Sequence, residues 1–152
     1  MQHTEFLYLP AAKKAQKAGK KYQLAKTFVI TLPSGKSDEK VQERALKSMY
    51  AGRPDLSLIA CRGGYKLTIP IGWEWDGPSG PTIDMPNNLL ASLVHDALYS
   101  LGLPLSARAW ADRMFYLLLR QEGMGWFRAN YWWAGVRIGA ESHFNTPKES
   151  TT

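Results

Sequence analysis

A stretch dense in glycine and proline, residues 73–86, divides the sequence into two parts with different apolar patterns. Glycine is conformationally permissive and proline lacks a backbone N–H, so this stretch is predicted to be a loop. Short runs rich in β-branched and aromatic residues precede it, at 26–32, 56–62 and 65–71. Apolar residues recur at helical spacing after it. The sequence therefore predicts an α+β fold in which a small antiparallel β-sheet is followed by helices.

Turn signals in the first part indicate how its strands pair. Gly63-Gly64 separates the second and third runs and favours a tight hairpin, because glycine readily adopts positive φ. The first run ends at Pro33-Ser34-Gly35. Residues 37–48 have acidic side chains early and basic side chains late, which suits the helix dipole and predicts a short amphipathic helix.

The second part is predicted to form three helices. The first is expected to begin at an Asp84 N-cap and to stop at Gly102. The second is expected to run from a Ser106 N-cap to Gly123, and residues 126–140 form the third. The turn between the first two is so short that these helices must be antiparallel neighbours.

Length and composition fit a single globular domain. The chain has 152 residues, of which 45% are hydrophobic and 21% charged, a balance too apolar for a disordered protein. We expect a flexible Lys-rich arm over residues 1–21, a domain over 22–144 and a disordered tail over 145–152. Much of the net charge of +6 comes from this arm. The arm is either a solvated charge run or a tether to an anionic surface, phospholipid in preference to nucleic acid.

The cysteine and hydropathy patterns exclude several classes of protein. Cys61 is the only cysteine, so an intramolecular disulfide and a multi-cysteine zinc site are excluded. A lone cysteine in an apolar strand is expected in the core. The N-terminus has no apolar signal-peptide region, and no segment approaches the roughly 20 apolar residues of a membrane span. We therefore expect a protein that is kept in a cytoplasm, or released from one by lysis.

A group of polar residues on the predicted helix pair has the types needed for general base catalysis. His95 and Tyr99 are four residues apart and share one face, whereas Asp96 lies about 100° away round the helix. The antiparallel pairing can bring Asp112 opposite them. An imidazole, an orienting carboxylate and a supporting phenol form a base with its partners. The alternative is a buried polar network that ties two helices together.

The preceding loop can supply ligands for a hard cation. Calcium prefers carboxylate and carbonyl oxygens, and a Gly-rich loop can present both beside Asp96. The candidate ligands in the loop are Asp76, Gly77, Ser79, Gly80 and Asp84.

Other side chains are candidates for binding a substrate, namely Trp75, Ser79, Arg108 and Arg137. The two arginines either bridge the helices to the acidic cluster or bind a phosphate group. The aromatic residues of the third helix are expected in the core and at its rim, although exposed Trp and Tyr beside a cationic arm would suit an interface with lipid. These residues are Trp126, Phe127, Tyr131, Trp132 and Trp133.

The loop and the helix pair together resemble a known class of enzyme. Residues 77–84, the HDALY sequence at 95–99 and the WADRMF sequence at 110–115 resemble the calcium loop and helix pair of phospholipases A2, most of all the disulfide-free viral form in parvovirus capsids. The resemblance implies that His95 activates a water molecule and that Asp96 binds Ca²⁺. It also implies that Tyr99 and Asp112 support His95, and that calcium polarises the ester carbonyl.

A second set of motifs covers more of the chain. It comprises Pro70, Gly72-Trp73, Asp76, Ser79, His95-Asp96, Tyr99, Arg108, Ala111-Asp112, Phe115, Tyr131, Val136-Arg137 and Gly139. These motifs resemble an uncharacterised family of small phage and prophage proteins, the domain of unknown function 1353. This resemblance implies a viral origin and a place in the host cytoplasm or the virion, and it offers no established reaction.

Two functions are left open by the sequence. The favoured one is a phage-encoded, phospholipase A2-like hydrolase assisted by a metal, with Ca²⁺ as the expected cofactor. The alternative is a non-enzymatic phage accessory or virion protein that uses the helix pair as a scaffold and the pocket to bind a partner or a small ligand. The partners considered are a virion component and a second copy of the chain. An enzyme needs His95 within reach of solvent, whereas a scaffold buries a fully satisfied cluster.

Overall fold

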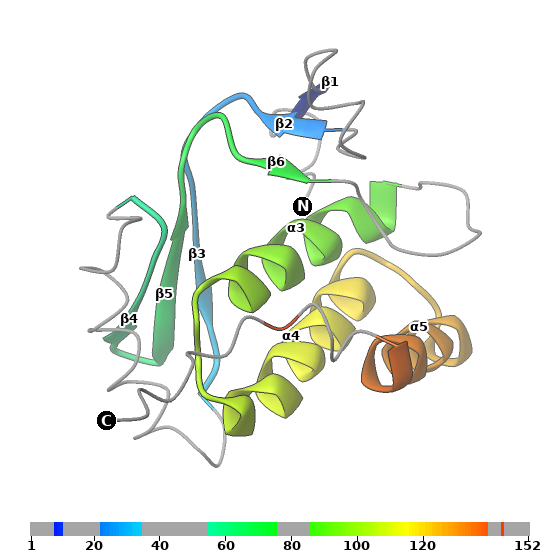
Figure 1. The fold of residues 1–152 in the computed structure, drawn as a ribbon. Coiled ribbons are helices and arrows are strands. Elements are labelled where there is room, and N and C mark those ends of the chain that lie inside the picture. Colours follow the sequence, from blue (N-terminus) through cyan, green and yellow to red (C-terminus); the bar gives the residue numbers. More distant parts are fainter. Residues whose placement is uncertain (1–7, 11–21, 35–54, 76–85, 140–143, 145–152) are drawn as a thin grey trace.

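The computed structural model describes residues 8–10, 22–34, 55–75, 86–139 and 144. Two small antiparallel sheets are followed by three helices, so the predicted α+β fold is confirmed (Figure 1). The strands are β1 (Tyr8–Pro10), β2 (Tyr22–Leu24), β3 (Phe28–Leu32), β4 (Ser57–Cys61), β5 (Gly64–Ile69) and β6 (Glu74–Trp75). The helices are α3 (Pro86–Ser100), α4 (Arg108–Gln121) and α5 (Trp126–Gly139), and a 3₁₀ turn, η1 (Leu105–Ala107), leads into α4.

The larger sheet has the order β3-β5-β4 and contains the predicted hairpin. Cys61 pairs with Gly64 at the end of the hairpin, and Gly64 has φ +146°. A Cβ atom at Gly64 would lie 1.9 Å from the backbone oxygen of Leu32, so only glycine fits beside β3. Cys61 is exposed, contrary to the expectation of a core position, because it is the last residue of β4 beside the turn.

A second sheet, of order β1-β2-β6, was not predicted. Its strands are two or three residues long, and β1 lies within the segment predicted as an arm. The lysines of that arm up to residue 21, and the helix expected over 37–48, lie outside the described residues. The proposed division of the chain at residues 21 and 144 stays a prediction.

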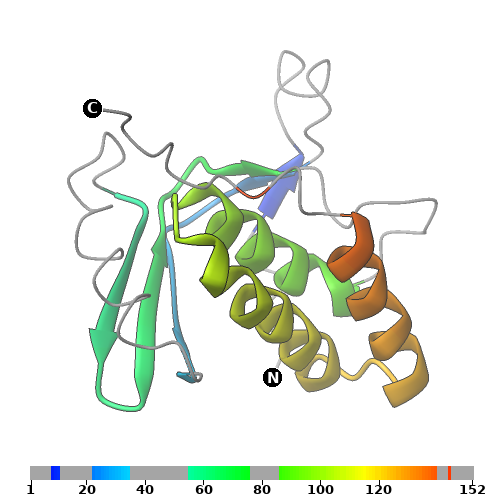
Figure 2. The same cartoon turned by 60° about the horizontal axis from the view of Figure 1, so that its bottom comes forward.

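The core lies between the larger sheet and the helices. Tyr65, Leu67 and Ile69 alternate along β5 and are buried, as period-two alternation requires of a strand with one covered face. Helix α3 is buried around most of its circumference, since it lies between the sheets and α4 (Figures 1 and 2). The indole of Trp110 on α4 reaches the sheet, where it donates a hydrogen bond of 2.8 Å to the carbonyl of Pro33.

Helices α3 and α4 run antiparallel side by side, as the short connection predicted (Figures 1 and 2). Gly102 and Gly123 have positive φ and follow the ends of α3 and α4. Ser106 is not an N-cap, because it lies inside η1. Pro104 has an extended backbone and precedes η1, and this 3₁₀ turn continues directly into α4. The expected cap Asp84 is outside the described residues. No described helix is both long and apolar enough to cross a membrane.

Candidate functional site

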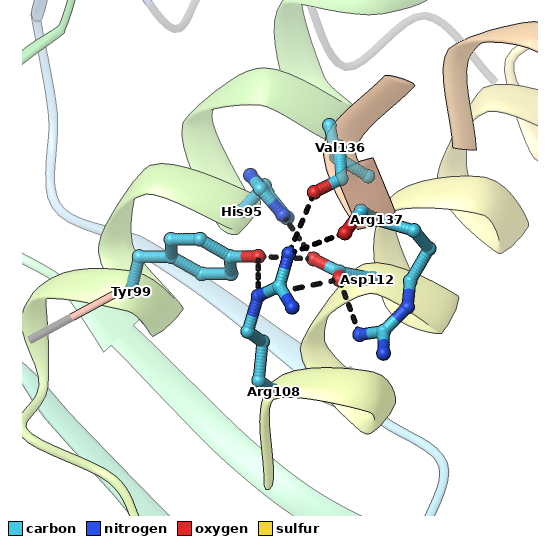
Figure 3. Close-up of polar contacts among 6 residues, drawn as sticks. All are labelled: His95, Tyr99, Arg108, Asp112, Val136 and Arg137. Atoms are coloured by element: carbon cyan, nitrogen blue, oxygen red, sulfur yellow. Dashed lines mark hydrogen bonds and ion pairs between the residues drawn. The ribbon is translucent and has the colours of Figure 1, made fainter. Parts of the chain in front are cut away.

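The helix pair brings His95, Tyr99 and Asp112 together at its centre (Figure 3). His95 and Tyr99 lie one turn apart on α3, and Asp112 faces them from α4. The His95 Nε2 atom is 2.7 Å from Asp112 Oδ1, and the Tyr99 hydroxyl donates to the same oxygen at 2.5 Å. The Asp112 side chain is fully buried, so these contacts replace the water that an exposed carboxylate would bind.

Two arginines approach Asp112 from its other side. Arg137 on α5 donates from Nη1 to Asp112 Oδ2 at 2.8 Å. Arg108 Nε lies 3.9 Å from the same oxygen and donates to the Tyr99 hydroxyl at 3.2 Å. The sequence left open whether these arginines bridge the helices to an acidic group or bind a phosphate. The contacts seen here are of the first kind.

Arg108 also fixes the end of α5 against the cluster. Its Nη2 atom donates to the carbonyls of Val136 at 2.9 Å and of Arg137 at 2.8 Å (Figure 3). A cation is favourable at the C-terminus of a helix, where carbonyl groups lack partners within the helix. The guanidinium therefore joins three helices, because it contacts α5, Tyr99 on α3 and Asp112 on its own helix.

The surroundings fix the protonation states of Asp112 and Tyr99. Burial alone would raise the pKa of Asp112, but hydrogen bonds from His95, Tyr99 and Arg137 outweigh it and hold this pKa below its ordinary value. Burial raises the pKa of Tyr99 well above its ordinary value, and the hydrogen bond to the Asp112 carboxylate raises it further. Asp112 is therefore an ionised acceptor and Tyr99 a protonated donor.

These states determine which nitrogen of His95 is available. An ionised carboxylate can only accept, so it favours the tautomer with the proton on Nε2 and the lone pair on Nδ1. The ring packs between Tyr99, with centroids 4.1 Å apart, and Phe115, with centroids 5.0 Å apart. The His95 side chain is 11% exposed, and within the described part of the chain Nδ1 has no hydrogen-bond partner.

Asp96 lies on a different flank of α3, as its position one residue after His95 predicts. Its Oδ2 atom accepts a hydrogen bond of 3.3 Å from the indole of Trp73. Asp96 lines a cleft of about 490 Å³ together with the carboxylates of Asp55 and Glu74 and the hydroxyl-bearing Ser100. The described residues contain no group of three or more His, Cys, Asp or Glu side chains placed to hold a metal ion.

A family model described as "Protein of unknown function (DUF1353)" matches residues 60–136. The chain belongs to this family. No curated protein and no solved structure matches the chain. The part matched by the DUF1353 model contains His95, Tyr99, Arg108 and Asp112, and it ends one residue before Arg137.

Several predicted site residues of this DUF1353 protein fall outside the cluster. Trp75, which was predicted to bind a substrate, is 1% exposed, and its indole donates to Ser92 Oγ at 3.3 Å within the core. In the two-residue strand β6, Glu74 points outward and Trp75 inward, in accordance with strand alternation. The predicted metal ligands Asp76, Gly77 and Gly80 and the predicted substrate residue Ser79 lie outside the described residues, as does Asp84.

Two aromatic residues of the DUF1353 chain contact the site, although the sequence predicted no site role for them. Phe115 packs against His95, and Trp73 binds Asp96. The position of Phe115 three residues after Asp112 is a signal that places both on one face of α4. No local signal predicts the contact of Trp73, because it depends on how the second sheet packs against α3.

Proposed function

We propose that this protein is a phospholipase A2-like ester hydrolase in which His95 is the general base. The observation that supports the proposal is the asymmetry of the His95 ring. Nε2 is held by an ionised, buried carboxylate, while Nδ1 has no partner among the described residues and the ring is partly exposed. A cluster that served only to join helices is expected to pair its polar atoms, whereas Nδ1 has no hydrogen-bond partner among the described residues.

The proposed reaction uses each member of the cluster. Nδ1 of His95 takes a proton from a water molecule as the water oxygen bonds to the ester carbonyl carbon. The tetrahedral intermediate then collapses, the bond to the alcohol oxygen breaks, and the proton on Nδ1 passes to that oxygen. Asp112 stabilises the imidazolium formed in between, and Tyr99 and Arg137 hold the carboxylate in place.

Calcium belongs to the proposal through the resemblance to phospholipases A2. Asp96 is the one expected ligand within the described residues, and the other expected ligands lie in the loop outside them. No step above depends on a metal. Phage origin, a place in the host cytoplasm or the virion, and binding of the Lys-rich arm to an anionic surface are also proposals that rest on the sequence.

The test is hydrolysis of a short-chain phospholipid that is soluble as a monomer, with calcium and with a chelator. The variants are His95→Asn, which removes the base, and Arg113→Gln, an exposed position on α4 outside the cluster. We expect His95→Asn to lower kcat by about 10²- to 10⁴-fold at a temperature at which circular dichroism shows the variant to be folded, and Arg113→Gln to have no effect. Loss of activity in the chelator would support a calcium requirement.

Either of two results would refute the proposal. The first is hydrolysis by His95→Asn at the rate of the native protein. The second is no hydrolysis of the phospholipid by the native protein, either with calcium or with the chelator. The second result would favour the alternative, in which the cluster is a scaffold in an accessory or virion protein.

A further inference from the structure

Helix α5 exposes an apolar face that the rest of the described chain leaves uncovered. Five of the eight exposed large hydrophobic side chains of the described residues lie on this helix. Phe127, Tyr131 and Ile138 are 80%, 71% and 86% exposed, respectively. With Ala134 they occur at i, i+4, i+7 and i+11, so they form one stripe along the helix. We call these four residues the α5 stripe.

The stripe is distinct from the face that packs into the domain. Ala129 and Trp132 are buried, and Val136 packs against the core. These residues lie on the opposite side of α5, which is therefore apolar on two sides. Figures 1 and 2 show α5 at the edge of the molecule, on the side of α4 away from the larger sheet. A helix that is apolar on two opposite sides is expected to be covered on both sides when the protein acts.

The charges on α5 indicate which kind of partner covers the α5 stripe. α5 contains no acidic residue, and Arg128 is exposed beside the stripe. A second copy docked through α5 would bring the Arg128 side chains of both copies to one interface, and α5 has no carboxylate to pair with them. An anionic partner is complementary to this face instead.

The residue types fit a lipid surface. Phe and Ile bury in the acyl boundary of a bilayer, Tyr suits the headgroup level, and Arg pairs with anionic headgroups. Trp126 and Trp133 lie on the flank of the same helix and are exposed as well. We infer that the α5 stripe docks on the surface of an anionic phospholipid bilayer. This docking needs no hydrolysis. If the proposed function also holds, it places the protein on the surface that contains its substrate.

The experiment measures co-sedimentation of the full chain with phosphatidylglycerol vesicles and with phosphatidylcholine vesicles. All proteins carry His95→Asn, so that hydrolysis cannot alter the vesicles. The stripe variant is Phe127→Ser combined with Ile138→Ser. The matched control is Ile71→Ser, an exposed isoleucine away from α5. Substitutions at such exposed positions leave the fold intact.

We expect the parent to partition into phosphatidylglycerol vesicles at least about tenfold better than into phosphatidylcholine. The stripe variant should lose at least about tenfold in this partitioning, and Ile71→Ser should match the parent. Equal binding of the stripe variant and the parent would overturn the inference, and binding would then be assigned to the lysines of the N-terminal segment. A stripe variant that instead converts a dimer to a monomer in size-exclusion chromatography would also overturn it, because the stripe would then be an interface between copies.

Discussion

The buried carboxylate of Asp112 is the group on which three helices converge, and Asp112→Asn removes its charge with almost no change in volume. The substitution leaves Arg137 and Arg108 without their counter-charge and places an amide where two oxygens accept hydrogen bonds. Removing one partner of a buried ion pair costs about 3–5 kcal/mol. The Arg137 side chain is 33% exposed, so water replaces part of what it loses. We therefore expect the free energy of unfolding to fall by about 3 kcal/mol.

This loss is a large part of the stability of a small domain, which is about 5–15 kcal/mol. For a chain of this size it corresponds to a melting temperature lower by about 6–12 °C. The assay is urea unfolding followed by circular dichroism. The matched control is Asp55→Asn, an exposed aspartate outside the cluster, whose effect should stay within about 0.5 kcal/mol.

The pH dependence tests the same reasoning independently. The pKa of Asp112 is lowered in the folded protein, so its contribution to stability is present above the ordinary aspartate pKa of about 3.9. The contribution is lost as the pH falls through the lower folded value. The native protein should therefore lose more stability than Asp112→Asn between about pH 5 and pH 2. A stability difference below about 1 kcal/mol at neutral pH, or parallel loss on acidification, would refute the argument.

Two further predictions concern Tyr99 and the hairpin. The pKa of Tyr99 is raised in the folded protein, so its contribution is present below the ordinary tyrosine pKa of about 10 and is lost as the pH rises through the folded value. Tyr99→Phe should therefore be less stable than the native protein at neutral pH by about 1–2 kcal/mol. In urea unfolding at increasing pH, its free energy of unfolding should fall less steeply than that of the native protein. Equally steep falls would contradict this prediction. Gly64→Ala should destabilise by more than the roughly 1–3 kcal/mol that its positive φ alone costs, because the new Cβ meets the Leu32 carbonyl. Gly63→Ala is the control in thermal unfolding, since it has a positive φ but open space around it, and equal losses would show that the close approach is unimportant.

The parts of the fold and site that follow from local rules were predictable from the sequence. The spacing of His95 and Tyr99 and the short turn before α4 were enough to bring Asp112 opposite them. Gly63-Gly64 predicted the hairpin for the same kind of reason, since the backbone of a tight turn constrains its residue types.

The parts that depend on long-range packing were not predictable. The β1-β2-β6 sheet is made of strands too short to show a period, so the burial of Trp75 in it could not be inferred. The partners of Arg108 and Arg137 were left open, because they depend on where α5 docks. α5 itself is apolar on two sides, so its sequence does not indicate which side faces the core.

The structural and the catalytic interpretation of the cluster do not exclude each other. A general base needs its orienting carboxylate to be ionised and immobile, and in a buried site this requires donors that outweigh the cost of desolvation. Asp112 has such donors in His95, Tyr99 and Arg137, and the same contacts hold the helices together. Loss of stability on mutating Asp112 is therefore expected whether or not the protein is an enzyme. Only His95 separates the two interpretations, because its Nδ1 atom has no hydrogen-bond partner among the described residues and is the proton acceptor in the proposed reaction.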